Sequence, residues 1–177
     1  MKFSPPKTLR SALLASRAAL VVAACVGGTG CSGATQPTPA VITGVMTKGS
    51  TIINGVRFED TTANISIDDT PKTAADLRDG MVVRVVGTVN TDGITGTAQR
   101  VEAQIEVRGT PTSVNPAASP QSLVVLGQTV FADDQTIYSN LAGFGDITTS
   151  TLIEVHGLRD TSGRIRATRI EANTAQM

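Results

Sequence analysis

Apolar and polar residues alternate along most of the chain after residue 40. In the clearest stretch, residues 100–108, apolar side chains alternate with charged or amide-bearing ones. The alternating apolar positions are Val101, Ala103, Ile105 and Val107. A period of two sustained over this length is typical of a half-buried β-strand and is not produced by a helix. The pattern therefore predicts a β protein.

The same pattern occurs twice. Gly87 returns as Gly157 after 70 positions, and the segment Ala98–Ala103 returns as Ala167–Ala172 after 69. Each copy is predicted to hold five strands. In the first copy these are 41–47, 50–58, 64–67, 81–90 and 94–107; in the second they are 107–114, 123–132, 136–138, 152–157 and 164–172.

A short helix is predicted in the first copy only. Thr73 followed by Asp76 has the spacing of a capping box, and Gly80 is suited to end a helix. In the second copy the segment 140–146 takes its place and contains two glycines. Five strands with a helix between the third and fourth is the plan of the OB-fold.

The expected fold class is therefore all-β: two tandem five-stranded OB-like small barrels, docked, with one short helix in the first. An open sandwich or meander with the same strands is the alternative. The domains are a signal peptide (1–31), a tether (32–40), repeat 1 (41–107) and repeat 2 (108–173). No linker separates the repeats, so the last strand of repeat 1 is expected to run on through residues 105–110.

The N-terminus has the features of an export signal. A basic start precedes a short apolar core, which is too short to span a bilayer. Small residues before Cys31 resemble the lipobox of bacterial lipoproteins, in which the cysteine carries the lipid; Cys25 is the alternative, and cleavage without lipidation is a third reading. A Cys25–Cys31 disulfide would close only a small loop outside the repeats. We expect a membrane-anchored lipoprotein, with Ser32 favouring the outer membrane facing the periplasm, or a secreted protein if no lipid is attached.

Charge argues against a nucleic-acid partner. The whole chain has 15 basic and 15 acidic residues. Four of the basic residues and none of the acidic ones precede Cys31, which leaves 11 against 15, a net charge of −4. Phosphate backbones bind clustered Lys and Arg, and bases stack on aromatic rings, which are few here.

No residue pattern indicates catalysis or a cofactor. The one histidine, His156, is expected to face solvent or the other repeat. The acidic pairs Glu59-Asp60, Asp68-Asp69 and Asp133-Asp134 could attract calcium, but they lack the spacing of a calcium loop and are expected to be solvated. We therefore expect no catalytic, cofactor-binding or metal-binding residues.

Several segments resemble a bacterial family of exported proteins with a repeated domain of unknown function, numbered 5666. They are residues 50–58, 80–87 and 98–103 in the first copy and 126–130, 153–157 and 167–172 in the second. The resemblance implies an exported, OB-like module and supplies no catalytic residues. Its motifs are glycines and valines, and the Gly80-Met81 pair is replaced by Ser150-Thr151 in the second copy.

These observations favour a non-catalytic cell-envelope lipoprotein built of two β-barrel binding or adaptor modules, with an envelope protein, a glycan or a small ligand as partner. A purely structural spacer is the first alternative. A metal-dependent enzyme is the second, and it would require Glu59, Asp68 and Asp133 to converge on one cleft.

Overall fold

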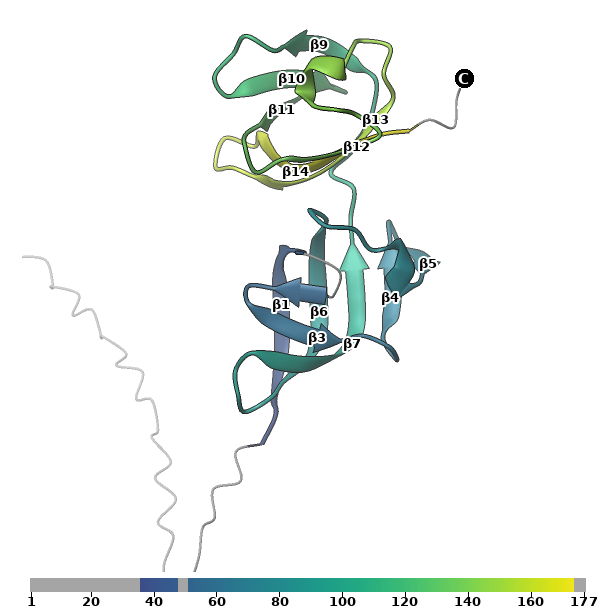
Figure 1. The fold of residues 1–177 in the computed structure, drawn as a ribbon, viewed down its shortest axis with the longest axis vertical. Helices are drawn as coiled ribbons and strands as arrows, with labels where there is room; N and C mark the ends of the chain where they lie inside the picture. The colour runs from purple at the N-terminus through teal and green to yellow at the C-terminus, as the bar shows by residue number, and fades with distance from the viewer. Residues whose placement is uncertain (1–35, 48–50, 174–177) are drawn as a thin grey trace, which may run out of the picture. The chain divides into compact units, whose positions relative to one another are not determined.

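The computed structural model describes residues 36–47 and 51–173 (Figure 1). In these ranges the chain is all-β, with two short 3-10 turns and no α-helix. Cys25 and Cys31 lie outside the described residues. None of the described segments is a helix with the length and apolar content that a membrane crossing requires.

Repeat 1 forms one mixed sheet of seven strands. Their order is β1-β6-β7-β3-β2, with β4 also paired to β7 and β5 paired to β4. The strands are β1 (Thr38–Val45), β2 (Thr51–Ile53), β3 (Val56–Glu59), β4 (Asn64–Ile67), β5 (Thr70–Lys72), β6 (Val82–Val89) and β7 (Thr95–Ala103), with the turn η1 (Ala74–Asp76) before β6.

Repeat 2 forms a second mixed sheet of seven strands. Their order is β8-β13-β14-β11-β10-β9, with β12 also paired to β14. The strands are β8 (Val107–Gly109), β9 (Pro111–Asn115), β10 (Gln121–Val125), β11 (Gln128–Ala132), β12 (Ile137–Ser139), β13 (Ile153–Arg159) and β14 (Ile165–Ala172), with the turn η2 (Phe144–Asp146) before β13.

The expected architecture of two five-stranded OB-like barrels with a helix is wrong, because each repeat is a seven-stranded mixed sheet. The helix predicted near Thr73 is a 3-10 turn of three residues. The capping contact does form, since the Thr73 N–H donates to the Asp76 carboxylate over 2.9 Å. Leu77 is already extended, and a segment this short gains too few hydrogen bonds to offset the cost of nucleating an α-helix.

The strand expected to run from one repeat into the next is interrupted. β7 ends at Ala103 and β8 begins at Val107. The Asp68 side chain accepts a hydrogen bond from the Ile105 N–H over 2.9 Å, and the Asp68 N–H donates to the Ala103 carbonyl over 3.0 Å. Asp68, a turn residue of repeat 1, therefore pairs with backbone groups that a continuous strand would have paired with a neighbouring strand.

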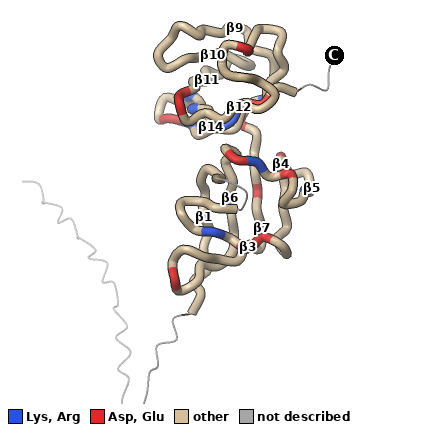
Figure 2. The backbone as a smooth tube through the Cα atoms, viewed as in Figure 1, with Lys and Arg blue, Asp and Glu red and all other residues tan. Residues whose placement is uncertain are grey.

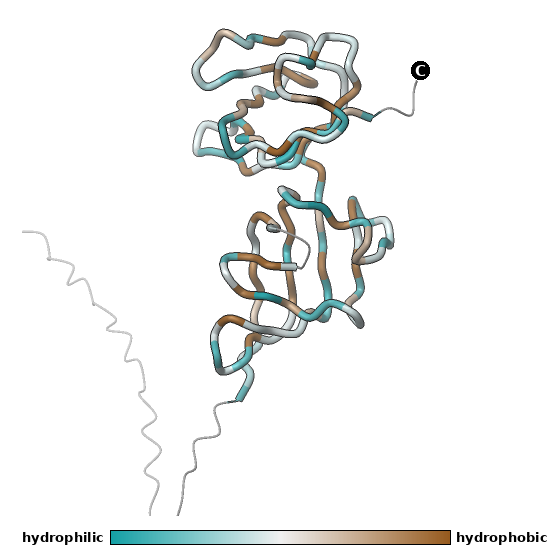
Figure 3. The backbone as a smooth tube through the Cα atoms, in the orientation of Figure 1, coloured by the Kyte–Doolittle hydropathy of each residue, from teal (hydrophilic) through white to brown (hydrophobic). Residues whose placement is uncertain are grey.

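Each repeat has its own hydrophobic core, made by the alternating apolar positions. The alternation is visible along the strands in Figure 3. In repeat 1 the buried residues are Met46, Ile53, Phe58, Ile65, Leu77, Met81, Val83, Val85, Ala98, Val101 and Ala103. In repeat 2 they are Val107, Leu123, Val125, Val130, Ala132, Phe144, Ile147, Ile153, Val155, Ile165, Ala167 and Ile170.

The repeated glycines Gly87 and Gly157 mark one structural feature. Both stand at a shift of register, in the β6–β7 pair and the β13–β14 pair. A Cβ at Gly87 would lie 2.1 Å from the Thr97 carbonyl oxygen, and one at Gly157 would lie 2.4 Å from that of Arg166. Only glycine allows the two backbones to approach this closely.

Candidate functional site

Buried polar side chains gather on β13 and β14. Three of the five buried polar or charged residues in the described ranges, His156, Thr168 and Arg169, lie on these strands. His156 and Arg169 face each other across the antiparallel pair, which brings their side chains together. All three bond to backbone carbonyls of residues 79–104, and this contact region is the joint between the repeats.

Thr168 forms the shortest of these bonds. Its Oγ1 donates to the Gly80 carbonyl over 2.6 Å. Gly80 has a φ of +84°, and a Cβ there would lie 2.8 Å from the Thr168 carbonyl oxygen. The close approach of the two backbones therefore requires glycine at position 80 for both conformation and space.

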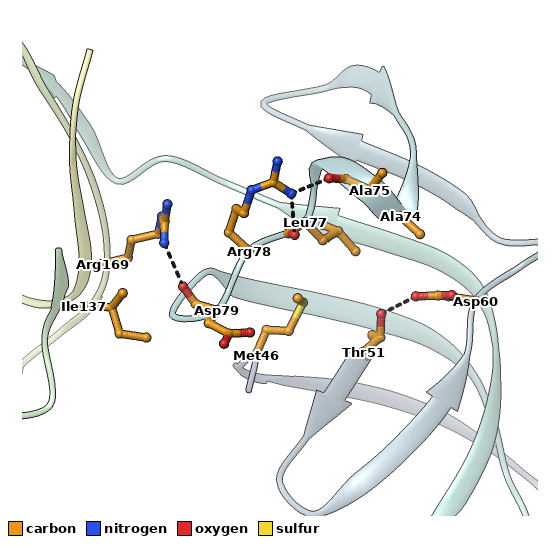
Figure 4. A pocket seen from close by; sticks show the side chains of 10 residues that line it. All are labelled: Met46, Thr51, Asp60, Ala74, Ala75, Leu77, Arg78, Asp79, Ile137 and Arg169. Carbon is orange, nitrogen blue, oxygen red and sulfur yellow. Dashed lines mark hydrogen bonds between the residues drawn. The ribbon is translucent and has the colours of Figure 1, made fainter. Parts of the chain in front are cut away.

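Arg169 is a buried cation, and each of its three guanidinium nitrogens donates a hydrogen bond. Its side chain is 8% exposed. It donates to the Asp79 carbonyl over 3.2 Å, as Figure 4 shows, and to the Glu171 carboxylate over 2.8 Å. Desolvation of an unpaired guanidinium would cost on the order of several kcal/mol. The nearby carboxylate offsets this cost.

His156 is 2% exposed, so of the two expected surroundings solvent is wrong, and the side chain faces repeat 1 instead. Its Nδ1 lies 2.9 Å from the Gln104 carbonyl oxygen. A carbonyl only accepts, so we assign the hydrogen to Nδ1. Burial lowers the pKa of His156, and the charge of Arg169 acts in the same direction, while the Gln104 bond opposes them.

A cleft of about 520 Å³ opens beside the joint (Figure 4). It is lined by Met46, Thr51, Asp60, Ala74, Ala75, Leu77, Arg78, Asp79, Ile137 and Arg169. Arg78 is exposed and donates to the carbonyls of Ala75 and Leu77. It has no carboxylate partner within the described ranges.

Arg78 also lines a second cleft, of about 390 Å³. The ionisable side chains around it are Asp68, Lys72, Asp76, Arg78, Arg108, Glu154, His156 and Glu171. Arg108 pairs with Glu154 over 2.9 Å. Acidic and basic positions are likewise interspersed over both repeats in Figure 2. Arg78 thus lines both clefts without an ion pair, while its charge is one of the causes that lower the pKa of Asp76.

The acidic pairs singled out in the sequence have separate local partners. Glu59 accepts from Thr61, Asp60 from Thr51, and Asp133 from Arg166 over 2.7 Å. The bond from Arg166 is the main reason that the pKa of Asp133 is lowered. Across residues 36–47 and 51–173, no group of three His, Cys, Asp or Glu side chains could hold a metal ion.

The sequence reasoning did not single out Arg78, Thr168 or Arg169. One signal could have found part of the joint, namely the positions at which the two copies differ. Val86 is replaced by His156, and Gln99 by Thr168. Only the first replacement introduces a hydrogen-bonding group, but both His156 and Thr168 bond to a backbone carbonyl at the joint.

Comparison with known proteins identifies both copies as one domain. The family described as Domain of unknown function (DUF5666) matches residues 40–102 and again residues 108–171. The chain belongs to this family. Comparisons with curated proteins and with solved structures gave no match. These comparisons therefore place the chain, with its two copies of the domain, in the DUF5666 family and supply no activity.

Proposed function

We propose that this DUF5666 protein is a non-catalytic binding module of the bacterial cell envelope. A lipid on Cys31 attaches it to a membrane, with the outer membrane facing the periplasm as the favoured location. Its partner, an envelope protein, a glycan or a small ligand, binds in the cleft beside the joint. The proposal concerns binding and includes no chemical step.

The observation that carries the proposal is the joint itself. Three buried side chains of repeat 2 bond to backbone carbonyls of residues 79–104, so the walls of the adjoining cleft are fixed relative to each other. A preformed cleft binds a ligand without the entropic cost of ordering its walls. Two repeats that served only as a spacer would not need such a cleft.

Arg78 gives the cleft a recognisable chemistry. Its guanidinium is held by two backbone carbonyls and lacks a carboxylate partner among the described residues. Arg is suited to bidentate recognition of carboxylate or phosphate groups. Ile137 and Ala74 supply apolar surface nearby. We therefore expect a ligand with an anionic group next to an apolar part.

Site-specific crosslinking in intact cells of the native host tests the binding site. A photoreactive residue at Ala74, on the lip of the cleft, should give a defined adduct. The same residue at Ile94, which is exposed on the β6–β7 turn, should not. Arg78→Gln removes the charge and should abolish the Ala74 adduct while leaving the melting temperature within a few degrees of the wild-type value. Equal crosslinking at Ala74 and Ile94, or an Ala74 adduct that Arg78→Gln does not reduce, would favour the alternative of a purely structural spacer.

Membrane attachment is tested separately with Cys31→Ala. We expect this variant to move from the membrane fraction to the soluble fraction, because the acyl chains provide the anchor. Cys25→Ala is the matched control and should remain in the membrane fraction. Retention of Cys31→Ala together with release of Cys25→Ala would assign the lipid to Cys25 instead.

A further inference from the structure

One strand of repeat 2 lacks the neighbour that its counterpart in repeat 1 has. In repeat 1, β3 and β4 lie along β7, and they are flanked on their other side by β2 and β5 respectively. In repeat 2, β11 and β12 lie along β14, and β10 flanks β11. Within the described ranges, β12 pairs with β14 alone.

The register shows that β4 and β12 are equivalent strands. Ile65 lies opposite Val101, and Tyr138 lies opposite the matching residue, Ile170. Nine positions separate Ile65 from the start of η1, whereas six separate Tyr138 from the start of η2. Repeat 2 is therefore shorter here by three residues, which is the length of β5.

The two outer edges also differ in composition. β5 carries Pro71 and Lys72, and all three of its residues are exposed. Proline and lysine are residues that protect a sheet edge from further pairing. β12 is Ile137-Tyr138-Ser139 and has neither. Isoleucine and tyrosine favour strands, so the edge of β12 is unpaired within the described residues and carries no proline or lysine.

An acidic and aromatic cleft of about 590 Å³ adjoins β12. Tyr138 and Phe144 give it aromatic surface, and Asp133 and Asp134 give it negative charge; no Lys or Arg lines it. The Asp133 carboxylate already forms an ion pair with Arg166. Asp134 is exposed and has no hydrogen bond or ion pair to the rest of the described chain.

We infer that the outer edge of β12 accepts an extended peptide strand of a partner protein, which pairs antiparallel as β5 does on β4 and places a basic side chain near Asp134. Backbone hydrogen bonds to the open edge would supply affinity, and the acidic cleft would supply specificity. This site goes beyond the proposed function, because it does not use Arg78 and its charged group is Asp134, although Ile137 of β12 also lines the cleft beside the joint.

Fluorescence anisotropy with defined probes tests the inference on the full chain in detergent. The probe is a labelled peptide that alternates lysine and valine; the control probe replaces each lysine with glutamate. We expect the lysine peptide to bind about tenfold or more tightly than the glutamate peptide. Asp134→Lys should weaken binding of the lysine peptide by about tenfold, whereas Thr149→Lys, which adds a positive charge on an exposed loop outside the cleft, should leave it unchanged.

A graft separates edge pairing from simple charge attraction. Replacing residues 140–143 by residues 67–73 of repeat 1 gives β12 its own covering strand and should abolish binding while Asp134 is retained. Binding that survives this graft, or that is equal for the two peptides, overturns the inference. Equal affinity of wild type and Asp134→Lys also overturns it, and this variant decides the question if the graft does not fold. If the free chain forms a dimer that Asp134→Lys or the graft dissociates, the occupant of the β12 edge is a second copy of this chain. That result also overturns the inference of a partner peptide.

Discussion

His156 and Val86 occupy the same position in the two repeats but have different surroundings. The same holds for the repeated arginine: the Arg100 side chain is 59% exposed, whereas that of Arg169 is 8% exposed. At the residue scale, the burial and the partners of a repeated position therefore depend on which copy meets the other repeat. Buried polar groups need partners, and the carbonyls of Gln104, Asp79 and Gly80 provide them here.

The buried histidine predicts a stability that falls in acid. In the unfolded chain the imidazole has an ordinary pKa of about 6.5, and burial lowers that pKa in the folded chain. Below about pH 6.5 the unfolded state therefore binds the proton more readily, so the free energy of unfolding decreases as the pH falls. Urea unfolding of wild type at about pH 7.5 and about pH 5.5 measures this loss.

His156→Val is the matched variant, since valine stands at the equivalent position of repeat 1. It should unfold with a smaller pH dependence over the same interval, whatever its absolute stability. An identical pH dependence in both proteins would show that His156 is not the group responsible.

At the element scale, β6 and β7 show how alternation produces a core. Val83 and Val85 point inward, while the Arg84 side chain lies at the surface and pairs with Glu102 on β7 over 2.9 Å. Such an exposed pair contributes about 0.2–1 kcal/mol. Burial of the two valines, about 1.5–3 kcal/mol each, dominates the energetics of this strand pair.

Val85→Asp should destabilise the chain by about 3 kcal/mol or more, because it buries an unpaired charge in the core of repeat 1. Val85 is 1% exposed. Val41→Asp is the matched control on the neighbouring strand β1, where the side chain is 59% exposed, and should cost about 0.5 kcal/mol or less. Thermal and urea unfolding measure both; similar losses would mean that the faces of the strands are reversed.

At the scale of the whole molecule, the joint combines two separate cores into one compact unit. Thr35–Met177 forms a single unit by its backbone contacts. The bonds between the repeats are few and polar, and they depend on close approach at Gly80. A change at this one position should therefore weaken the joint without entering either core.

Gly80→Ala should destabilise the chain by about 1–3 kcal/mol more than Gly93→Ala. Both glycines have positive φ, so both alanines are strained by about 1 kcal/mol. Only at position 80 does the new Cβ also meet the Thr168 carbonyl oxygen, since nothing lies within 4 Å of a Cβ at Gly93. Urea unfolding compares the two, and equal losses would show that the joint tolerates a side chain there.

Most strands could be predicted because their signal is local. Alternation placed β6, β7, β13 and β14, and the internal repeat gave both copies the same central pairing, β6–β7 and β13–β14. β4 was predicted with the bounds that it has, 64–67, but β5 was missed. Thr70-Pro71-Lys72 has no apolar pattern and pairs with β4 after Asp68 and Asp69 turn the chain back. The architecture was misjudged for two reasons. β5 adds a strand that the sequence does not show, and three stretches predicted as single strands each divide into two, namely 50–58 (β2 and β3), 107–114 (β8 and β9) and 123–132 (β10 and β11).

The sequence by itself determined a duplicated β unit, its aliphatic cores and its family, because periodicity and repetition are properties of the chain alone. Only the tertiary structure decided that His156 is buried, that Arg169 and Arg100 differ in exposure, and that β12 lacks a covering strand. The burial of His156 and Arg169 arises from contacts between residues up to 90 positions apart, such as Arg169 with Asp79, and no local pattern encodes such a contact.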